Sequence, residues 1–261
     1  MKKLLLASLL TVASGSAFAK AGVAGSVDNV PAQGEEAGSG WNVQLGLGVV
    51  SAPEFAGSDE TETTAVPLIN VTYNNWAYFE YNKLGAWLWQ PDDTGLRLGV
   101  VATPKKGYDR GDGPFPGHEV DDQTLAGLRV NWKSGMFALD AQVLGSAEED
   151  SGGEVRVQGT YTWVLSEKAT LTAMVKVEAM SEDAVDYYYY GGNVQDNTYT
   201  PDAANNVSFG VIGTYAIAPK WTLLGAVLNT SYDDSITDVQ KFSGNAEDSG
   251  TTAFVGATYK F

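Results

Sequence analysis

The sequence predicts an all-β protein, a transmembrane antiparallel β-barrel of the bacterial outer-membrane type with about 12 strands, short periplasmic turns and long exterior loops. Three observations predict it. Residues 251–261 alternate between apolar and polar side chains and stop at an aromatic residue, the amino terminus carries an export signal, and the two-residue period returns in the segments between. Such a strand places one face on lipid and the other on a polar interior. Taken alone, residues 251–261 fit an edge strand of a soluble sandwich equally well.

The first 19 residues have the organisation of a secretory signal peptide. Lys2 and Lys3 precede an apolar run of nine residues, and small residues then lead to an A-x-A cleavage pattern formed by Ala17 and Ala19. The apolar run is too short to span a bilayer. We therefore expect the mature chain to begin at Lys20.

Two further segments follow the predicted signal peptide. Residues 20–40 are rich in Gly, Ala, Ser and Glu and lack periodicity, which predicts a flexible periplasmic lead-in. Residues 41–261 carry the two-residue period and are predicted to form the outer-membrane barrel.

The composition supports a barrel and excludes other classes of protein. With 30 Gly, 13 Tyr and 7 Trp in 261 residues, the mean hydropathy of −0.14 is what alternating lipid-facing and lumen-facing residues average to. The absence of Cys excludes disulfides and thiolate metal sites. The net charge of −16 becomes −18 when Lys2 and Lys3 leave with the signal. Nucleic acid is excluded as a partner, because its binding requires a basic surface.

The individual strands follow from the alternation, which begins at Trp41. They are predicted over residues 41–49, 65–73, 76–82, 84–90, 95–104, 123–133, 136–145, 154–165, 169–180, 207–218, 221–231 and 251–261. The count is even, as in bacterial single-chain barrels. It depends on a tight bend at residues 82–84, since one continuous strand over 76–90 would make the count odd.

The lengths of the connections alternate as a barrel requires, with short turns in the periplasm and long loops outside. The short connections are residues 74–75, 91–94, 134–135, 166–168 and 219–220. The long ones are residues 51–63, 105–122, 146–153, 181–206 and 232–250.

The last predicted strand also carries a candidate assembly signal. Its apolar face ends in an alternating series, Val255, Ala257, Tyr259 and Phe261. The opposite face is polar or small except for Phe254. A terminal Phe preceded by alternate apolar residues resembles the signal that the barrel assembly machinery recognises, so this machinery is an expected partner.

Charged residues of both signs occupy inward positions on neighbouring strands. They are Glu80, Arg97, Arg129, Asp140, Glu154, Arg156, Lys176 and Glu178. Charges in a barrel lumen are stable when they are paired or hydrated. They either fill and brace a narrow interior, which we favour, or line a selective conduction pathway.

The long loops contain residues that suggest other functions. Acidic clusters such as residues 148–150 would be solvated, or would share divalent cations with lipopolysaccharide. Tyr187 to Tyr190 fit a membrane-interface girdle or the packed base of a loop better than a recognition patch. The single histidine, His118, has no Ser nearby, so we expect neither a catalytic site nor a cofactor.

Several stretches together resemble the MipA/OmpV family of outer-membrane proteins, named for interaction with a murein transglycosylase. The matching residues are Pro53, Gly57, Ser58, Pro67, Tyr73, Arg110, Asp122, Leu125, Gly127, Leu128, Tyr190, Gly191, Tyr199, Pro201, Asp234 and Ser235. One departure is Ile236, where the family usually has Pro.

The resemblance implies a non-enzymatic barrel in the outer membrane of a Gram-negative bacterium, in contact with outer-membrane lipid and lipopolysaccharide. It further implies a scaffold for murein-remodelling enzymes, namely a lytic transglycosylase and a penicillin-binding protein. A small-solute channel and an exterior receptor or adhesin are the alternative functions.

Overall fold

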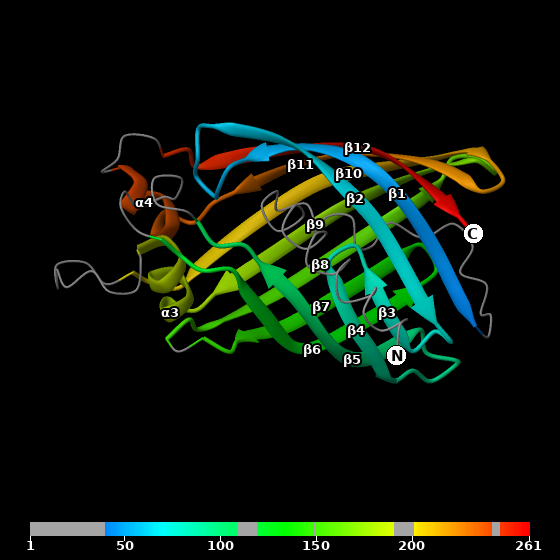
Figure 1. Ribbon diagram of the computed structural model, residues 1–261, viewed down its shortest axis with the longest axis horizontal. Helices are drawn as coiled ribbons and strands as arrows, with labels where there is room; N and C mark the ends of the chain where they lie inside the picture. The colour runs from blue at the N-terminus through cyan, green and yellow to red at the C-terminus, as the bar shows by residue number, and fades with distance from the viewer. Residues whose placement is uncertain (1–39, 109–118, 149, 191–200, 242–245) are drawn as a thin grey trace, which may run out of the picture.

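The computed structural model describes residues 40–108, 119–148, 150–190, 201–241 and 246–261, and these residues form a closed antiparallel barrel (Figure 1). Each strand pairs with its sequence neighbours, and β12 pairs with β1. The predicted 12-stranded barrel is therefore confirmed. The strands are β1 (Trp41–Pro53), β2 (Thr61–Tyr73), β3 (Ala77–Glu80), β4 (Lys83–Trp89), β5 (Leu96–Lys105), β6 (Gln123–Ser134), β7 (Phe137–Ser146), β8 (Gly153–Val164), β9 (Ala169–Met180), β10 (Ala204–Ala218), β11 (Trp221–Ser231) and β12 (Ser249–Lys260).

The described parts of the long connections contain three short helical segments. The α-helix α3 (Glu182–Val185) and the π-helix η1 (Asp186–Tyr190) precede β10, and the α-helix α4 (Asp234–Lys241) follows β11. Sequence patterning did not predict them, because each is too short to show a helical period. In the described part of the chain, no helix is long and apolar enough to cross a membrane.

The barrel closes through the first and last strands. Their antiparallel register runs from the pair Gln44 and Lys260 to the pair Ser51 and Ala253. The backbone N–H of Phe261 adds a hydrogen bond of 3.0 Å to the Val43 carbonyl. With both edges paired, closure leaves no free strand edge at this seam.

The two ends of the barrel differ as the connection lengths predict. Figure 1 shows α3 and α4 together at one end, while the tight turns and the start of β1 lie at the other. The β2–β3 turn is made by Asn74 and Asn75, whose φ angles of 49° and 57° lie in the left-handed region that Asn tolerates. Gly95, with φ 64°, turns against β6, where a Cβ atom would lie 2.0 Å from the Lys133 carbonyl oxygen.

The β3–β4 hairpin is short, and its turn lies at Tyr81 and Asn82, one residue before the predicted bend. The Tyr81 N–H donates to the Ile69 carbonyl of β2. In the described residues, the part of β2 that precedes Ile69, residues 61–68, pairs only with β1. Pro67 lies on this edge, where its missing N–H removes no ladder hydrogen bond.

Strands β1 and β2 extend further into the first long loop than predicted. β1 continues to Pro53 and β2 begins at Thr61, so much of the segment 51–63 is paired strand. The apolar alternation ends before the pairing does, since Glu62, Thr63 and Thr64 are all polar. The sequence pattern reports which face meets lipid, whereas the ladder continues as long as backbone groups can pair.

The outer wall exposes an apolar surface that a soluble protein would bury. Large exposed side chains on this wall include Leu47, Leu128, Val143, Phe209, Val227 and Val255. Aromatic rings contact one another at the short-turn end, in the pairs Trp41–Tyr73, Trp221–Tyr259, Tyr259–Phe261, Phe137–Tyr161 and Tyr161–Trp163. An apolar band bordered by an aromatic girdle is the surface of a membrane barrel.

The interior has an apolar side and a charged side. A buried apolar cluster, contributed mainly by β1, β2 and β9–β12, comprises Val50, Ala52, Val66, Leu68, Tyr81, Met174, Ile212, Leu224, Ala226, Leu228 and Phe254. The Phe254 ring lies over Gly48 and Gly256, where added Cβ atoms would come within 3 Å of it. The large apolar residue on the polar face of β12 therefore belongs to an internal core.

Candidate functional site: the polar interior

A first charge network lies in the middle of the barrel around Arg129. Its Nε and Nη1 atoms donate hydrogen bonds of 2.7 Å each to Asp140 on β7 and Glu80 on β3. The side chains of Arg129 and Asp140 are only 2% and 5% exposed. Asn131 and Gln142 also donate to the Asp140 carboxylate. Every charge in this network is thus paired, as burial requires.

A second charge network lies closer to the long-loop end. Glu154 accepts from Lys105 and from Arg156, and Glu178 lies opposite Arg156 on the paired strands β8 and β9. Lys176 Nζ is 2.8 Å from the Glu178 carboxylate. Adjacent strands in register bring these five side chains together, which is why two-residue alternation was sufficient to group most of them.

Among the described residues, the two networks and their neighbours carry more cations than carboxylates. With Lys83 and Arg97, they hold six cations, Lys83, Arg97, Lys105, Arg129, Arg156 and Lys176, against four carboxylates, Glu80, Asp140, Glu154 and Glu178. Six minus four leaves +2, in a chain whose net charge is −16. The acidic excess therefore lies outside these networks.

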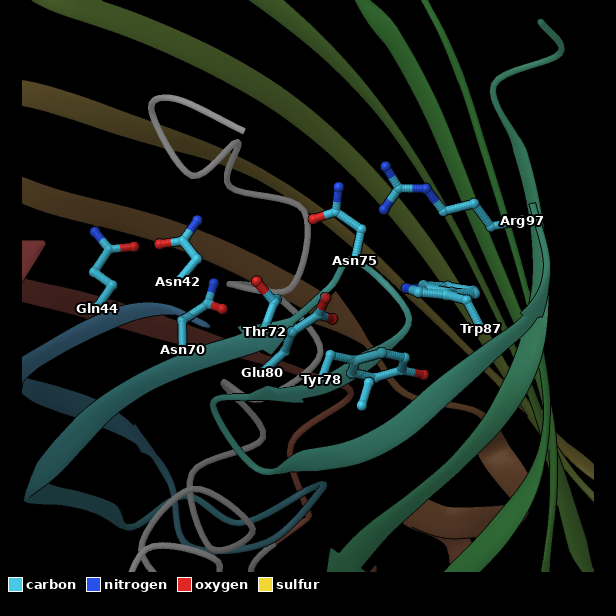
Figure 2. A pocket seen from close by; sticks show the side chains of 10 residues that line it. Asn42, Gln44, Asn70, Thr72, Asn75, Tyr78, Glu80, Trp87 and Arg97 are labelled. Carbon is cyan, nitrogen blue, oxygen red and sulfur yellow. The ribbon is translucent and has the colours of Figure 1, made fainter. Parts of the chain in front are cut away.

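A polar pocket opens beside the first network at the short-turn end (Figure 2). Asn42 and Gln44 of β1 pair in register with Thr72 and Asn70 of β2 and form one wall. The rest of the lining is Asn75, Ala77, Tyr78, Glu80, Trp87 and Arg97. The pocket holds about 550 Å³ of empty space, part of it open to solvent.

Aromatic rings form the floor between the pocket and the first network. Tyr78 packs over Gly85 on the paired strand, and its ring lies 5.1 Å from that of Trp87. The Arg129 guanidinium is 5.0 Å from both ring centroids, while Arg97 is 5.9 Å from Trp87. These cation–π contacts hold the arginines in place on the ring faces.

A cap of packed loop residues covers the long-loop end. Its core contains Tyr188, Tyr189 and Tyr190 of η1, together with Val185 and Ile236. Burial raises the pKa values of Tyr188 and Tyr189 well above 10.0, so both hydroxyls remain neutral. The run of tyrosines is thus the packed base of a loop, one of the two predicted alternatives to a recognition patch.

Residues that carry the family resemblance meet in this cap. The Tyr190 hydroxyl donates a 2.9 Å hydrogen bond to the Ser235 carbonyl, joining η1 to α4. Gly57 accepts from the Glu247 N–H, and Ser58 forms a bridge with Ala246. Ile236, in place of the usual Pro, is fully buried within α4.

The remaining predicted site residues lie as follows. Pro53 ends β1, Pro67 and Tyr73 lie in β2, Asp122 accepts from the Gly107 N–H, and Pro201 precedes β10. Val255, Ala257 and Tyr259 share the outward face of β12, and Phe261 is 68% exposed. Ala17, Ala19, Arg110, Gly191 and Tyr199 lie outside the described residues.

Sequence analysis missed several interior residues. Lys83 is buried at the tip of the β3–β4 hairpin, and Lys105 belongs to β5, whose predicted strand ended one residue earlier. The sequence did not predict a role for the pocket amides Asn42 and Asn70, because uncharged polar residues are common on the inward face of a barrel strand. What marks these two positions in the sequence is an amide side chain where other inward positions hold small residues.

The fold and the polar interior define a membrane-type β-barrel protein with an ion-paired lumen. The family model described as "MltA-interacting protein MipA" matches residues 45–261. The chain belongs to this family, as the sequence resemblance predicted. No curated protein matches the chain.

Three solved structures similar to this chain are distant from it in sequence. The translocator domain of the autotransporter NalP from Neisseria meningitidis is 12% identical, with a TM-score of 0.42 over 94% of this chain and 100% of its own. Pseudomonas putida OprB is 8% identical, with a TM-score of 0.41 over 85% of this chain and 94% of its own. The NanC porin is 12% identical, with a TM-score of 0.40 over 85% and 100%.

Proposed function

We propose that this protein is a non-enzymatic barrel of the outer membrane of a Gram-negative bacterium and acts as a scaffold for murein-remodelling enzymes. The observation that carries the proposal is membership, over residues 45–261, of a family described by its interaction with MltA. The proposed partners are a lytic transglycosylase and, with it, a penicillin-binding protein. The apolar outer wall with its aromatic girdle supports placement in the membrane.

The interior chemistry supports bracing rather than catalysis. Asp140, Glu154 and Glu178 each face at least one cation and are engaged in ion pairs. Carboxylates held in this way stabilise the barrel wall and are poor proton donors or acceptors for a substrate. The polar interior therefore gives the protein a rigid platform.

The contact with a murein enzyme belongs at the short-turn end. Murein lies on the inner side of the outer membrane, and short turns face that side in bacterial barrels. A stable interface needs about 800 Å² from each partner, which small turns alone do not supply. We therefore assign the main contact to the lead-in, residues 20–40, which precedes the start of β1 at that end.

Deletion of residues 22–39 tests this assignment. The variant is expected to fold as a barrel but to lose most co-purification with a lytic transglycosylase, because the contact area is gone. Two double charge reversals, both at exposed residues, supply a matched comparison. Asp92→Lys with Asp93→Lys alters the β4–β5 turn, and Glu182→Lys with Asp183→Lys alters the opposite end.

Only changes at the short-turn end should weaken the complex. Loss of co-purification with the Glu182 and Asp183 reversals, but not with the lead-in deletion, would show that the protein works outward as a receptor or adhesin. Deletion of the whole segment 181–206 is less informative, because it would also remove the buried Val185 and Tyr188 to Tyr190.

A small-solute channel is the second candidate, and the polar pocket and the cationic balance of the lumen favour it. Such a channel would prefer anions, since the cations exceed the carboxylates. Single-channel conductance of the purified protein in a planar bilayer tests this function directly. Stable anion-selective steps would support the channel, and their absence would support the scaffold.

A further inference from the structure

The tip of the β3–β4 hairpin is buried, although turns normally lie at the protein surface. Tyr81, Asn82 and Lys83 are 5%, 4% and 2% exposed, whereas Asn75 of the β2–β3 turn is exposed. Figure 1 shows β3 and β4 as a short pair between β2 and β5. The next residue, Leu84, is 54% exposed on the outer wall. The buried tip therefore packs toward the lumen and forms no part of the outer surface.

The end of this hairpin contacts both sides of the lumen. Tyr81 belongs to the buried apolar cluster of the interior. The residue before it, Glu80, accepts a 2.7 Å hydrogen bond from Arg129 on β6. Because β4 and β5 lie between β3 and β6, this ion pair is made inside the barrel, across two strands. Lys83 has a similar position, since it is a neighbouring cation of Asp140 on β7. The tip thus lies between the apolar side and the charged side of the interior.

The residues of the turn do not favour the turn itself. Tyr81 has a φ of 57°, and Asn82 has no positive φ, which is the pattern of a type II′ turn. Gly normally occupies the first central position of that turn, and a bulky side chain there is strained. Asn82 Oδ1 is buried without a hydrogen-bond partner in the described part of the chain. Strain of this kind is found where the position of a side chain matters for function. The location of the Tyr81 ring therefore outweighs the stability of the turn.

From these features we propose that the β3–β4 hairpin tip is an internal plug, in which the Tyr81 ring closes the lumen to small hydrophilic solutes and ions. The ring fills space beside the apolar cluster. The ion pair of Glu80 with Arg129, and the position of Lys83 near Asp140, hold the tip toward the charged wall. Short side chains at the tip would leave a passage along that wall.

The plug goes beyond the proposed function, because a scaffold makes no demand on the lumen. It also bears on the second candidate, since it separates the charge of the inner wall from the openness of the barrel. A parent protein without conductance is expected, and the conductance of variants shows which residue closes the lumen.

Single-channel recording of the full-length protein in planar bilayers, in potassium chloride, tests the plug. The parent protein is expected to give no stable steps. Tyr81→Gly should give stable steps, because Gly adopts a φ of 57° without strain and only the ring is lost. Tyr81→Phe keeps the ring and should remain closed. Folding of each variant is checked by the mobility of unheated samples in detergent gels. If Tyr81→Gly assembles poorly, Tyr81→Asn takes its place with the same expected steps, because Asn tolerates this φ.

Asn75→Gly is the matched control, because Asn75 has the same φ of 57° and is exposed in the β2–β3 turn. It should remain closed. If Tyr81 serves only to form its turn, Tyr81→Gly will also give no steps, and that result would overturn the proposal. Steps in the parent protein as large as those of Tyr81→Gly would overturn it as well, since the ring would then close nothing.

The reversal potential in a potassium chloride gradient locates the opening. In the Tyr81→Gly background, Lys83→Gln should shift this potential toward a lower preference for anions, because a cation at the edge of the opening is lost. Lys168→Gln removes an exposed charge from the β8–β9 turn and should leave the potential unchanged. An equal response to both substitutions would place the opening elsewhere in the lumen and overturn the assignment.

Co-purification with the transglycosylase separates the plug from the scaffold function. Tyr81→Gly should bind the enzyme as the parent protein does, because the tip lies inside the barrel. Normal enzyme binding together with a Tyr81→Gly variant that gives no steps would overturn the plug and leave the scaffold. Steps in Tyr81→Gly, with a parent protein that does not bind the enzyme, would overturn the scaffold and leave the plug.

Discussion

Replacing Arg129 by Met should destabilise the barrel more than any other single charge removal. The guanidinium makes two hydrogen bonds of 2.7 Å, to Asp140 and Glu80, and lies 5.0 Å from the Tyr78 and Trp87 rings. Met fills much of the same volume but removes the guanidinium from both carboxylates, which keep only Lys83 as a neighbouring cation. Glu80 is 19% exposed and can recruit water, whereas Asp140 is 5% exposed and cannot.

The expected cost follows from the buried carboxylate. Breaking a buried ion pair by removing one partner costs about 3–5 kcal/mol. Asn131 and Gln142 continue to donate to Asp140, so we place Arg129→Met at the lower end, about 3 kcal/mol in the free energy of unfolding. The second substitution Asp140→Asn removes the stranded charge, and the double variant should recover at least about 1 kcal/mol.

Urea unfolding in lipid vesicles, followed by tryptophan fluorescence, measures both values. Lys168→Met is the control, because it removes an exposed charge from the β8–β9 turn and should change the free energy by less than about 0.5 kcal/mol. A cost below about 1 kcal/mol for Arg129→Met would contradict the bracing role. So would a double variant less stable than Arg129→Met alone, since relief of the stranded Asp140 charge would then be absent.

Four further predictions follow from other parts of the chain. Phe254→Ala should lower the free energy of unfolding by about 3–5 kcal/mol, because Phe254 is 4% exposed and its ring covers Gly48 and Gly256. Val255→Ala, at a site on the outer wall that is 62% exposed, should lower it less in the same unfolding assay. Deleting Phe261, or replacing Tyr259 and Phe261 with Ser, should lower the yield of assembled barrel more than changes at Thr258 and Lys260, and equal yields would contradict the assembly signal. Burial alone would raise the pKa of Asp233, but hydrogen bonds from the Ser235 and Asn205 N–H groups hold this pKa below 3.8. The contribution of Asp233 to the stability of the cap is therefore present above pH 3.8 and is lost as the pH falls through the lowered pKa. Hydrogen exchange of the Ser235 and Asn205 amides should accelerate over this acid range in the parent protein but not in Asp233→Asn, which has no carboxyl group to titrate. The protein should fractionate with the outer membrane and amino-terminal sequencing should begin at Lys20, whereas recovery from the soluble periplasm would contradict the placement.

The resemblance to a murein-associated family and the structure bear on different ends of the molecule. Tyr190, Ser235, Gly57 and Ser58 hold together the cap at the long-loop end. The proposed enzyme contact lies at the other end, where Tyr73 of β2 is the nearest residue that carries the resemblance. Part of the family pattern therefore marks how the long-loop end is held together.

Sequence alone determined the barrel and the facing of its strands. Side chains alternate with a period of two, so the apolar series ending in Val255 had to share one face, and Arg129 and Asp140 had to share the interior. Alternation also placed Phe254 inside, although its partners were not predictable. Local periodicity carries this information because it needs no knowledge of which strands become neighbours.

Only the tertiary structure decided what the inward side chains do. The ion pair of Arg129 with Glu80 joins residues 49 positions apart in the chain, on strands that are not direct neighbours. Likewise, the pocket exists because Arg97 on β5 faces Asn42 and Asn70 on β1 and β2 across the mouth. Strand curvature and barrel closure set these distances, and both arise from the summed twist and register of all 12 strands. The two-residue pattern fixes which face a residue occupies, whereas the residue it meets across the lumen depends on the whole closed sheet.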